Sequence, residues 1–168
     1  MMNVKSNVSN TFSYNGSVNI SLKTKGRIYP FSFHNTGTKL LLDTVTKALC
    51  GEDISDSRPT HLDIQHLVAG KYVSALKSPV PLTGAVWGTA AQASPNEGVV
   101  LVNGVITEED KEITVGTLTS PKLVITTDSG GILASIDSSN IQTMFSSITE
   151  STDALIEWRM IFTCGGTN

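Results

Sequence analysis

Apolar and polar residues alternate along much of this chain, with the period of a β-strand that has one buried face. The alternation is clear at Val18, Ile20 and Leu22, which polar residues separate and a Thr24-Lys25-Gly26 turn follows. Residues 154–163 form the last and longest of the predicted strands. Further strands are predicted at 27–33, where Pro30 indicates an edge or a bulge, and at 62–66, 71–75, 85–91, 113–118, 123–127 and 132–136.

A turn is predicted at Asn103-Gly104, because this pair suits the two positive φ angles of a type I′ hairpin turn. The flanking residues 99–102 and 105–107 are rich in β-branched side chains. We therefore expect two short strands joined by this turn.

One helix is predicted at about 38–50. Its apolar stripe follows the spacing i, i+4, i+7 and i+8 and consists of Leu41, Val45, Ala48 and Leu49, widened by Leu42. Thr36 or Thr38 can accept a hydrogen bond as the N-cap, and Gly51 stands where a left-handed C-cap is favoured.

These elements predict a mainly β fold: an antiparallel β-sandwich or flattened barrel of about nine or ten strands with one α-helix. The Asn- and Ser-rich residues 1–16 are predicted to form an extended N-terminal arm, and residues 17–168 a single β-sandwich domain. The apolar anchors of the arm are Val4, Val8, Phe12 and Tyr14.

Composition favours protein contacts over nucleic-acid binding. Charged residues make up 16% of the chain, against about 25% in typical soluble proteins, whereas 19 serines and 20 threonines supply hydroxyls. The net charge is −3 and the chain has three scattered arginines and no basic run, so no binding to nucleic acid is expected. A hydroxyl-rich surface suits large contacts with other proteins, because burying a hydroxyl costs less than burying an ion.

No apolar run predicts a signal peptide or a membrane span, and we expect synthesis in a reducing cytoplasm. Cys50 closes the apolar side of the helix and Cys164 ends a predicted core strand. Both are therefore predicted to be free and buried, with a disulfide between them as the alternative.

No catalytic residue, metal ligand or cofactor site is predicted. His61 and Asp63 would share one face of a strand and His66 the other, so these three do not converge on a metal. The segment 34–38 lacks the glycine-rich spacing of a phosphate cradle and is interpreted as a strand-to-helix turn. No Gly-x-Ser-x-Gly elbow occurs, and the acidic residues 108–112 are interpreted as a solvated loop.

The two tryptophans leave alternatives open. Trp87 and Trp158 lie in predicted strands, where core or interface packing is expected. Exposed on a flat or concave face, either ring could instead stack on a sugar. A carbohydrate-binding β-sandwich is therefore the alternative of another class.

Two stretches of the chain support a family resemblance. In the first, an aromatic strand ends in Phe33-His34-Asn35-Thr36-Gly37-Thr38, passes into one helix closed by Gly51, and precedes Arg58-Pro59. The second is the closing run of residues 156–163. Together they resemble small β-rich virion proteins of tailed bacteriophages.

The resemblance implies a non-enzymatic structural component that is made in the host cytoplasm and resides in the virion. Its partners would be other virion proteins, and it would form a homo-oligomer or a multi-copy assembly. Docking on the capsid as an auxiliary or head-fibre base protein is the first expectation, and a tail or collar ring component is the second. The predicted interface residues are Val4, Val8, Phe12, Tyr14, Trp87 and Trp158.

Overall fold

In the computed structural model, β-strands make up most of the described chain, which comprises residues 11–87, 97–112, 118–137, 141, 144 and 152–165. The strands are β1 (Thr11–Thr24), β2 (Arg27–Gly37), β3 (His61–Val68), β4 (Lys71–Ser74), β5 (Val80–Pro81), β6 (Thr83–Trp87), β7 (Glu97–Ile106), β8 (Lys122–Thr126), β9 (Ile132–Ile136) and β10 (Asp153–Gly165). The remaining named elements are helix α1 (Lys39–Leu49) and two 3₁₀ turns, Ser55–Ser57 and Glu108–Asp110.

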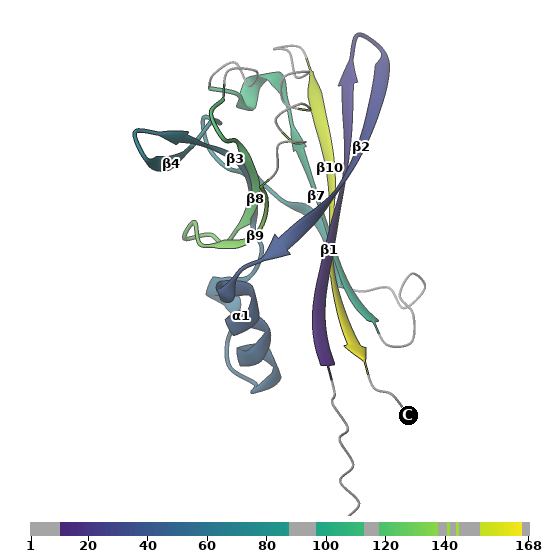
Figure 1. Cartoon of the computed structure of the whole chain (residues 1–168), viewed down its shortest axis with the longest axis vertical. Helices are drawn as coiled ribbons and strands as arrows, with labels where there is room; N and C mark the ends of the chain where they lie inside the picture. Colours follow the sequence, from purple (N-terminus) through teal and green to yellow (C-terminus); the bar gives the residue numbers. More distant parts are fainter. Residues whose placement is uncertain are drawn as a thin grey trace, which may run out of the picture.

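All strand pairs are antiparallel, and the strand order is β4-β3-β8-β9-β2-β1-β10-β7-β6, with β5 also paired to β3. The long strand β2 joins two layers. It pairs with β1 along most of its length but with β9 only at Thr36 and Gly37. The sheet therefore curls into a half-barrel (Figure 1), which confirms the predicted β-sandwich or flattened barrel with one helix.

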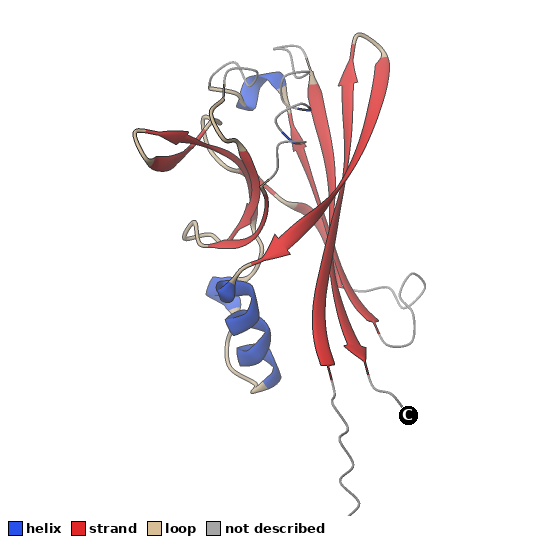
Figure 2. Cartoon of the chain, in the orientation of Figure 1, coloured by secondary structure: helices blue, strands red, loops and turns tan. Residues whose placement is uncertain are grey.

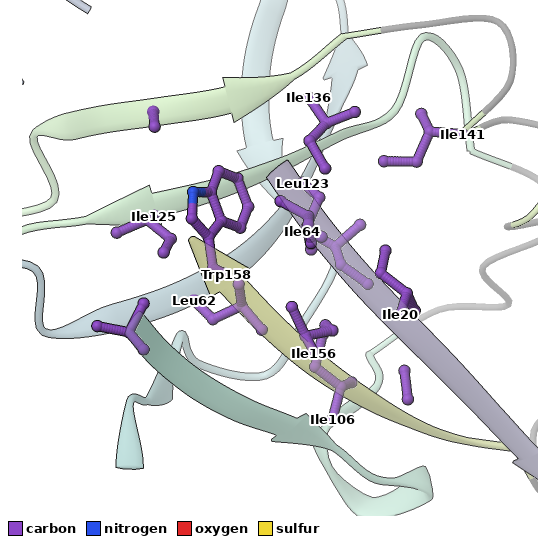
Figure 3. Close-up of a cluster of buried hydrophobic side chains, with 14 of the residues drawn as sticks. Ile20, Leu62, Ile64, Ile106, Leu123, Ile125, Ile136, Ile141, Ile156 and Trp158 are labelled. Atoms are coloured by element: carbon purple, nitrogen blue, oxygen red, sulfur yellow. The ribbon is translucent and has the colours of Figure 1, made fainter. Parts of the chain in front are cut away.

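We call β2, β1, β10, β7 and β6 the long-strand layer, and β4, β3, β8, β9 and β5 the short-strand layer. The core lies between them, because inward side chains alternate with outward ones along each strand. From the long-strand layer it receives Val18, Ile20, Leu22, Val102, Ile106, Ile156 and Trp158. From the other layer it receives Leu62, Ile64, Leu123, Ile125 and Ile136, many of which Figure 3 shows around the Trp158 ring.

The first hairpin follows the sequence pattern closely. Lys25 and Gly26 have φ angles of 47° and 76°, so the predicted turn is confirmed and has both residues in the left-handed region. Pro30 pairs with Ser21 of β1, and among the described strands β2 has no second neighbour at this position. This confirms the predicted edge position. Proline has no N–H to donate, and at an edge no hydrogen bond between strands requires one.

The hairpin predicted at Asn103-Gly104 is wrong. Both residues lie inside β7, opposite Glu157 and Ile156 of β10. In β7 the alternation of inward and outward residues continues through Gly104, which faces inward. An added Cβ there would be 3.0 Å from the Leu62 side chain. Continuous pairing with β10 and close packing on Leu62 thus override the local turn preference of this dipeptide.

The boundary of the predicted N-terminal arm is also wrong. β1 begins at Thr11, and residues 11–16 pair with β10 from Gly165 to Met160. Residues 1–10 lie outside the described part of the chain, as does most of the strand predicted at 113–118. The strand predicted at 85–91 begins earlier, as β6, and its last residues are likewise outside.

Asp63 is a buried carboxyl in β3. It accepts hydrogen bonds from Ser74 Oγ at 2.6 Å and from Gln65 Nε2 at 3.3 Å. Burial raises the pKa of Asp63, because the charged form loses hydration, and these two hydrogen bonds only partly oppose that rise. The folded protein therefore holds this proton to a higher pH than the unfolded chain does.

We expect Asp63→Asn to become progressively more stable, relative to the natural protein, as pH rises from 4 to 7. The stability that protonated Asp63 contributes is complete below its unfolded pKa of about 3.8 and is lost as pH rises through the raised folded value. Urea midpoints measured along this pH series check the expectation. The exposed change Asp56→Asn is the control, and a constant gap between natural and Asp63→Asn proteins would contradict it.

Candidate functional site

The two layers differ in length, and this difference creates the site. β1 and β10 have 14 and 13 residues, whereas β8 and β9 have five each. The short-strand layer therefore covers only part of the long-strand layer. Helix α1 faces the lower ends of β10 and β7 instead (Figure 2), at a distance that leaves open space between them.

The N-terminal end of helix α1 is fixed to strand β9. The Thr38 side chain caps it at Leu41 N (3.4 Å) and donates to Ile132 O of β9 at 2.6 Å, and Leu41 is buried. Gly51, with φ of 74°, ends the helix as predicted. Its C-terminal end is open, because residues 46–49 are all exposed and Leu49 is 81% exposed.

We call the open space between α1 and the sheet the α1 groove. Its volume is about 480 Å³, within the usual range for ligand pockets. Its lining comes from α1, the loop after it, β7, β9 and β10, and consists of Leu41, Thr44, Val45, Ala48, Leu49, Ile54, Ser57, Arg58, Pro59, Gly98, Val99, Val100, Leu133, Met160 and Phe162.

The groove is suited to apolar side chains. Three lining residues have polar side chains, and the Thr44 hydroxyl already donates to Leu40 O at 2.8 Å. The others are Ser57 and the exposed Arg58. With so few polar groups, the lining offers shape and apolar surface, which orient a chain segment better than a polar substrate.

A second hollow lies beside α1 and shares Leu41, Val45 and Phe162 with the groove. This Tyr14 pocket has a volume of about 350 Å³ and is lined by Tyr14, Gly37, Thr38, Lys39, Leu41, Leu42, Val45 and Phe162. The Tyr14 ring packs on Phe162 with centroids 5.4 Å apart. The two hollows thus adjoin each other along the Leu41–Val45 part of helix α1.

A network of hydrogen bonds centred on Asn35 lies beside these hollows. Asn35 bonds the Tyr14 hydroxyl through its amide nitrogen, and its oxygen accepts from Trp158 Nε1 at 3.2 Å and Ser17 N at 3.0 Å. Burial raises the pKa of Tyr14 to about 12, so this phenol stays protonated at neutral pH. Asn35 was expected to organise a turn, but it lies within β2 and joins β1 to β10.

Of the predicted interface residues, the structure describes the side chains of Tyr14 and Trp158. Val4 and Val8 lie outside the described residues, as do the side chains of Phe12 and Trp87. Tyr14 lines a pocket beside α1. Trp158 is 0% exposed, so the prediction that it meets a partner is wrong: its ring fills the space between the layers.

Sequence reasoning missed the groove, although the helix pattern contained a signal. The apolar stripe includes Ala48 and Leu49, which lie past the end of the short-strand layer and stay exposed. Cys50 beyond them is an exposed free thiol, so its predicted burial is wrong for the same reason. The Cys164 side chain is outside the described part.

His61, Asp63 and His66 do not form a metal site. Asp63 accepts a hydrogen bond from Ser74, and His61 Nδ1 lies 2.8 Å from Thr60 Oγ1. Among the residues that the structure describes, no group of three or more His, Cys, Asp or Glu could hold a metal ion. Within the same residues no helix is long and apolar enough to cross a membrane.

Comparison with known proteins adds no relative. No protein-family model matches the chain, and no curated protein or solved structure is significantly similar to it.

Proposed function

We propose that this chain is a non-enzymatic structural component of a bacteriophage virion that docks on the capsid through protein–protein contacts. The observation that carries the proposal is the α1 groove, an apolar hollow of about 480 Å³ beside a helix whose Leu49 is 81% exposed. Exposed apolar surface of this kind is typical of sites that another protein covers. The hydroxyl-rich composition and the resemblance to virion proteins support the capsid setting.

Two other functions are less well supported. A tail or collar ring component would use the same groove, and the resemblance ranks it second. A carbohydrate-binding module needs an exposed tryptophan, and Trp158 cannot serve because it is fully buried. That alternative now depends on Trp87 alone.

The test uses particles purified from the source that encodes the chain. We expect the chain in a fixed ratio to the major capsid protein, measured by quantitative mass spectrometry. Leu49→Asp should reduce incorporation at least tenfold, because a buried unpaired carboxylate is costly in an apolar groove. Thr46→Asp adds the same charge to the same end of α1 but outside both hollows, so its incorporation should be unchanged.

Two outcomes would overturn the proposal. Particles that lack the chain would show that it is not a virion component. Equal incorporation of Leu49→Asp and Thr46→Asp would show that the groove is not the docking surface. Thermal melting of both variants checks that each has folded.

A further inference from the structure

The α1 groove needs an occupant that lies along the helix. Its walls are α1 on one side and Met160 and Phe162 of β10 on the other. The part of the helix that lines the groove, from Leu41 to Leu49, is about 12 Å long at 1.5 Å per residue. An extended segment of about five residues matches that length.

The residues before Thr11 have the pattern of such a segment. In β1 the even-numbered residues face inward, from Tyr14 beside α1 to the buried Val18 and Ile20. Upstream in the sequence the alternation is partial. Met2, Val4 and Val8 are even-numbered and apolar, Ser6 and Asn10 are even-numbered and polar, and residues 3, 5, 7 and 9 are all polar. In extended form Val4 and Val8 would lie on one side of the segment, about 13 Å apart.

The direction of β1 favours the groove of another copy. The groove residues Met160 and Phe162 pair with Gly16 and Tyr14, whereas Thr11 pairs with Gly165 beyond them. At Thr11 the strand therefore points away from its own groove (Figure 1). Residues 1–10 would enter that groove only by reversing direction immediately before a residue that is still paired. A second copy imposes no such reversal.

We propose that residues 4–8 of one copy of this chain lie extended in the α1 groove of a second copy, with Val4 and Val8 inserted between α1 and β10. Every copy has both the segment and the groove, so two copies can exchange segments reciprocally in a closed dimer, or the contact can repeat head-to-tail in a ring or an open array. The inference deepens the proposed function and rests on it in one respect, because the virion is where many copies of this chain would be brought together.

The test separates the donor from the acceptor. Val4→Ser/Val8→Ser removes the apolar side of the segment, and Asn3→Ser/Asn7→Ser is its matched control at the same spacing. Leu49→Asp blocks the groove, and Thr46→Asp is the control for charge. Light scattering during size-exclusion chromatography gives the mass of each protein at equal concentration.

We expect the natural chain and both controls to have a mass of at least two chains of 17.9 kDa. The donor and acceptor variants should each have the mass of one chain. Mixed together, they should form a one-to-one complex, because the Leu49→Asp chain keeps its segment and the Val4→Ser/Val8→Ser chain keeps its groove.

A monomeric natural chain would overturn the inference, and so would a Val4→Ser/Val8→Ser protein that still associates. Association in the mixture, together with particles that lack the chain, would refute the virion proposal alone. Particles that contain the chain, together with a mixture that does not associate, would refute the exchange of segments alone.

Discussion

Replacing Trp158 by alanine should lower the free energy of unfolding by about 3–5 kcal/mol, the usual cost of removing a large aromatic side chain from a core. Trp158 is 0% exposed and packs between the two layers, opposite strands β3 and β8. Its Nε1–H also donates to Asn35, so alanine removes both packing and a buried hydrogen bond. Such a loss is a large fraction of the total stability of an ordinary domain.

Urea denaturation followed by circular dichroism measures this loss, and Trp158→Phe covers the case in which the alanine variant does not fold. Phenylalanine keeps most of the packing and loses the hydrogen bond, so its cost should be smaller. Tyr29→Ala removes an aromatic ring that is 43% exposed and should cost much less. A stable Trp158→Ala protein that failed to assemble would instead restore the interface role predicted from the sequence.

Gly16→Ala should cost about 2–4 kcal/mol, although it adds only one methyl group. The new Cβ would lie 2.3 Å from Cγ of Asn35 and within 2.4 Å of both the oxygen and the nitrogen of its amide. That amide cannot move freely, because it is bonded to Tyr14, Trp158 and Ser17. The methyl group therefore either strains β1 or leaves buried polar atoms unpaired.

A double-mutant cycle tests this cause. Asn35→Ala alone should be destabilising, because it removes the buried amide that hydrogen-bonds Tyr14, Trp158 and Ser17. Adding Gly16→Ala to it should cost little more, since the clash is gone. Gly98→Ala is the control, because an added Cβ there meets no heavy atom within 4 Å. Strictly additive costs would show that Gly16 and Asn35 are independent.

Part of the candidate site could be predicted from the sequence because its signals are local. The helix, its Thr38 cap and its Gly51 ending depend on residues within a few positions of one another. The apolar stripe through Leu49 is visible in the same window. Whether that stripe is covered depends on β8 and β9, which lie more than seventy residues away in sequence.

The sequence by itself determined the fold class, the strands with clear alternation such as β1 and β10, and the capped helix, because periodicity and capping act over short distances. Only the tertiary structure decided where those elements meet. It placed Asn103-Gly104 inside β7, buried Trp158, and extended β1 back to Thr11, because each outcome depends on pairing or packing with β10 or β3. It also left Leu49 and Cys50 exposed, because strands of five residues cannot cover strands of thirteen.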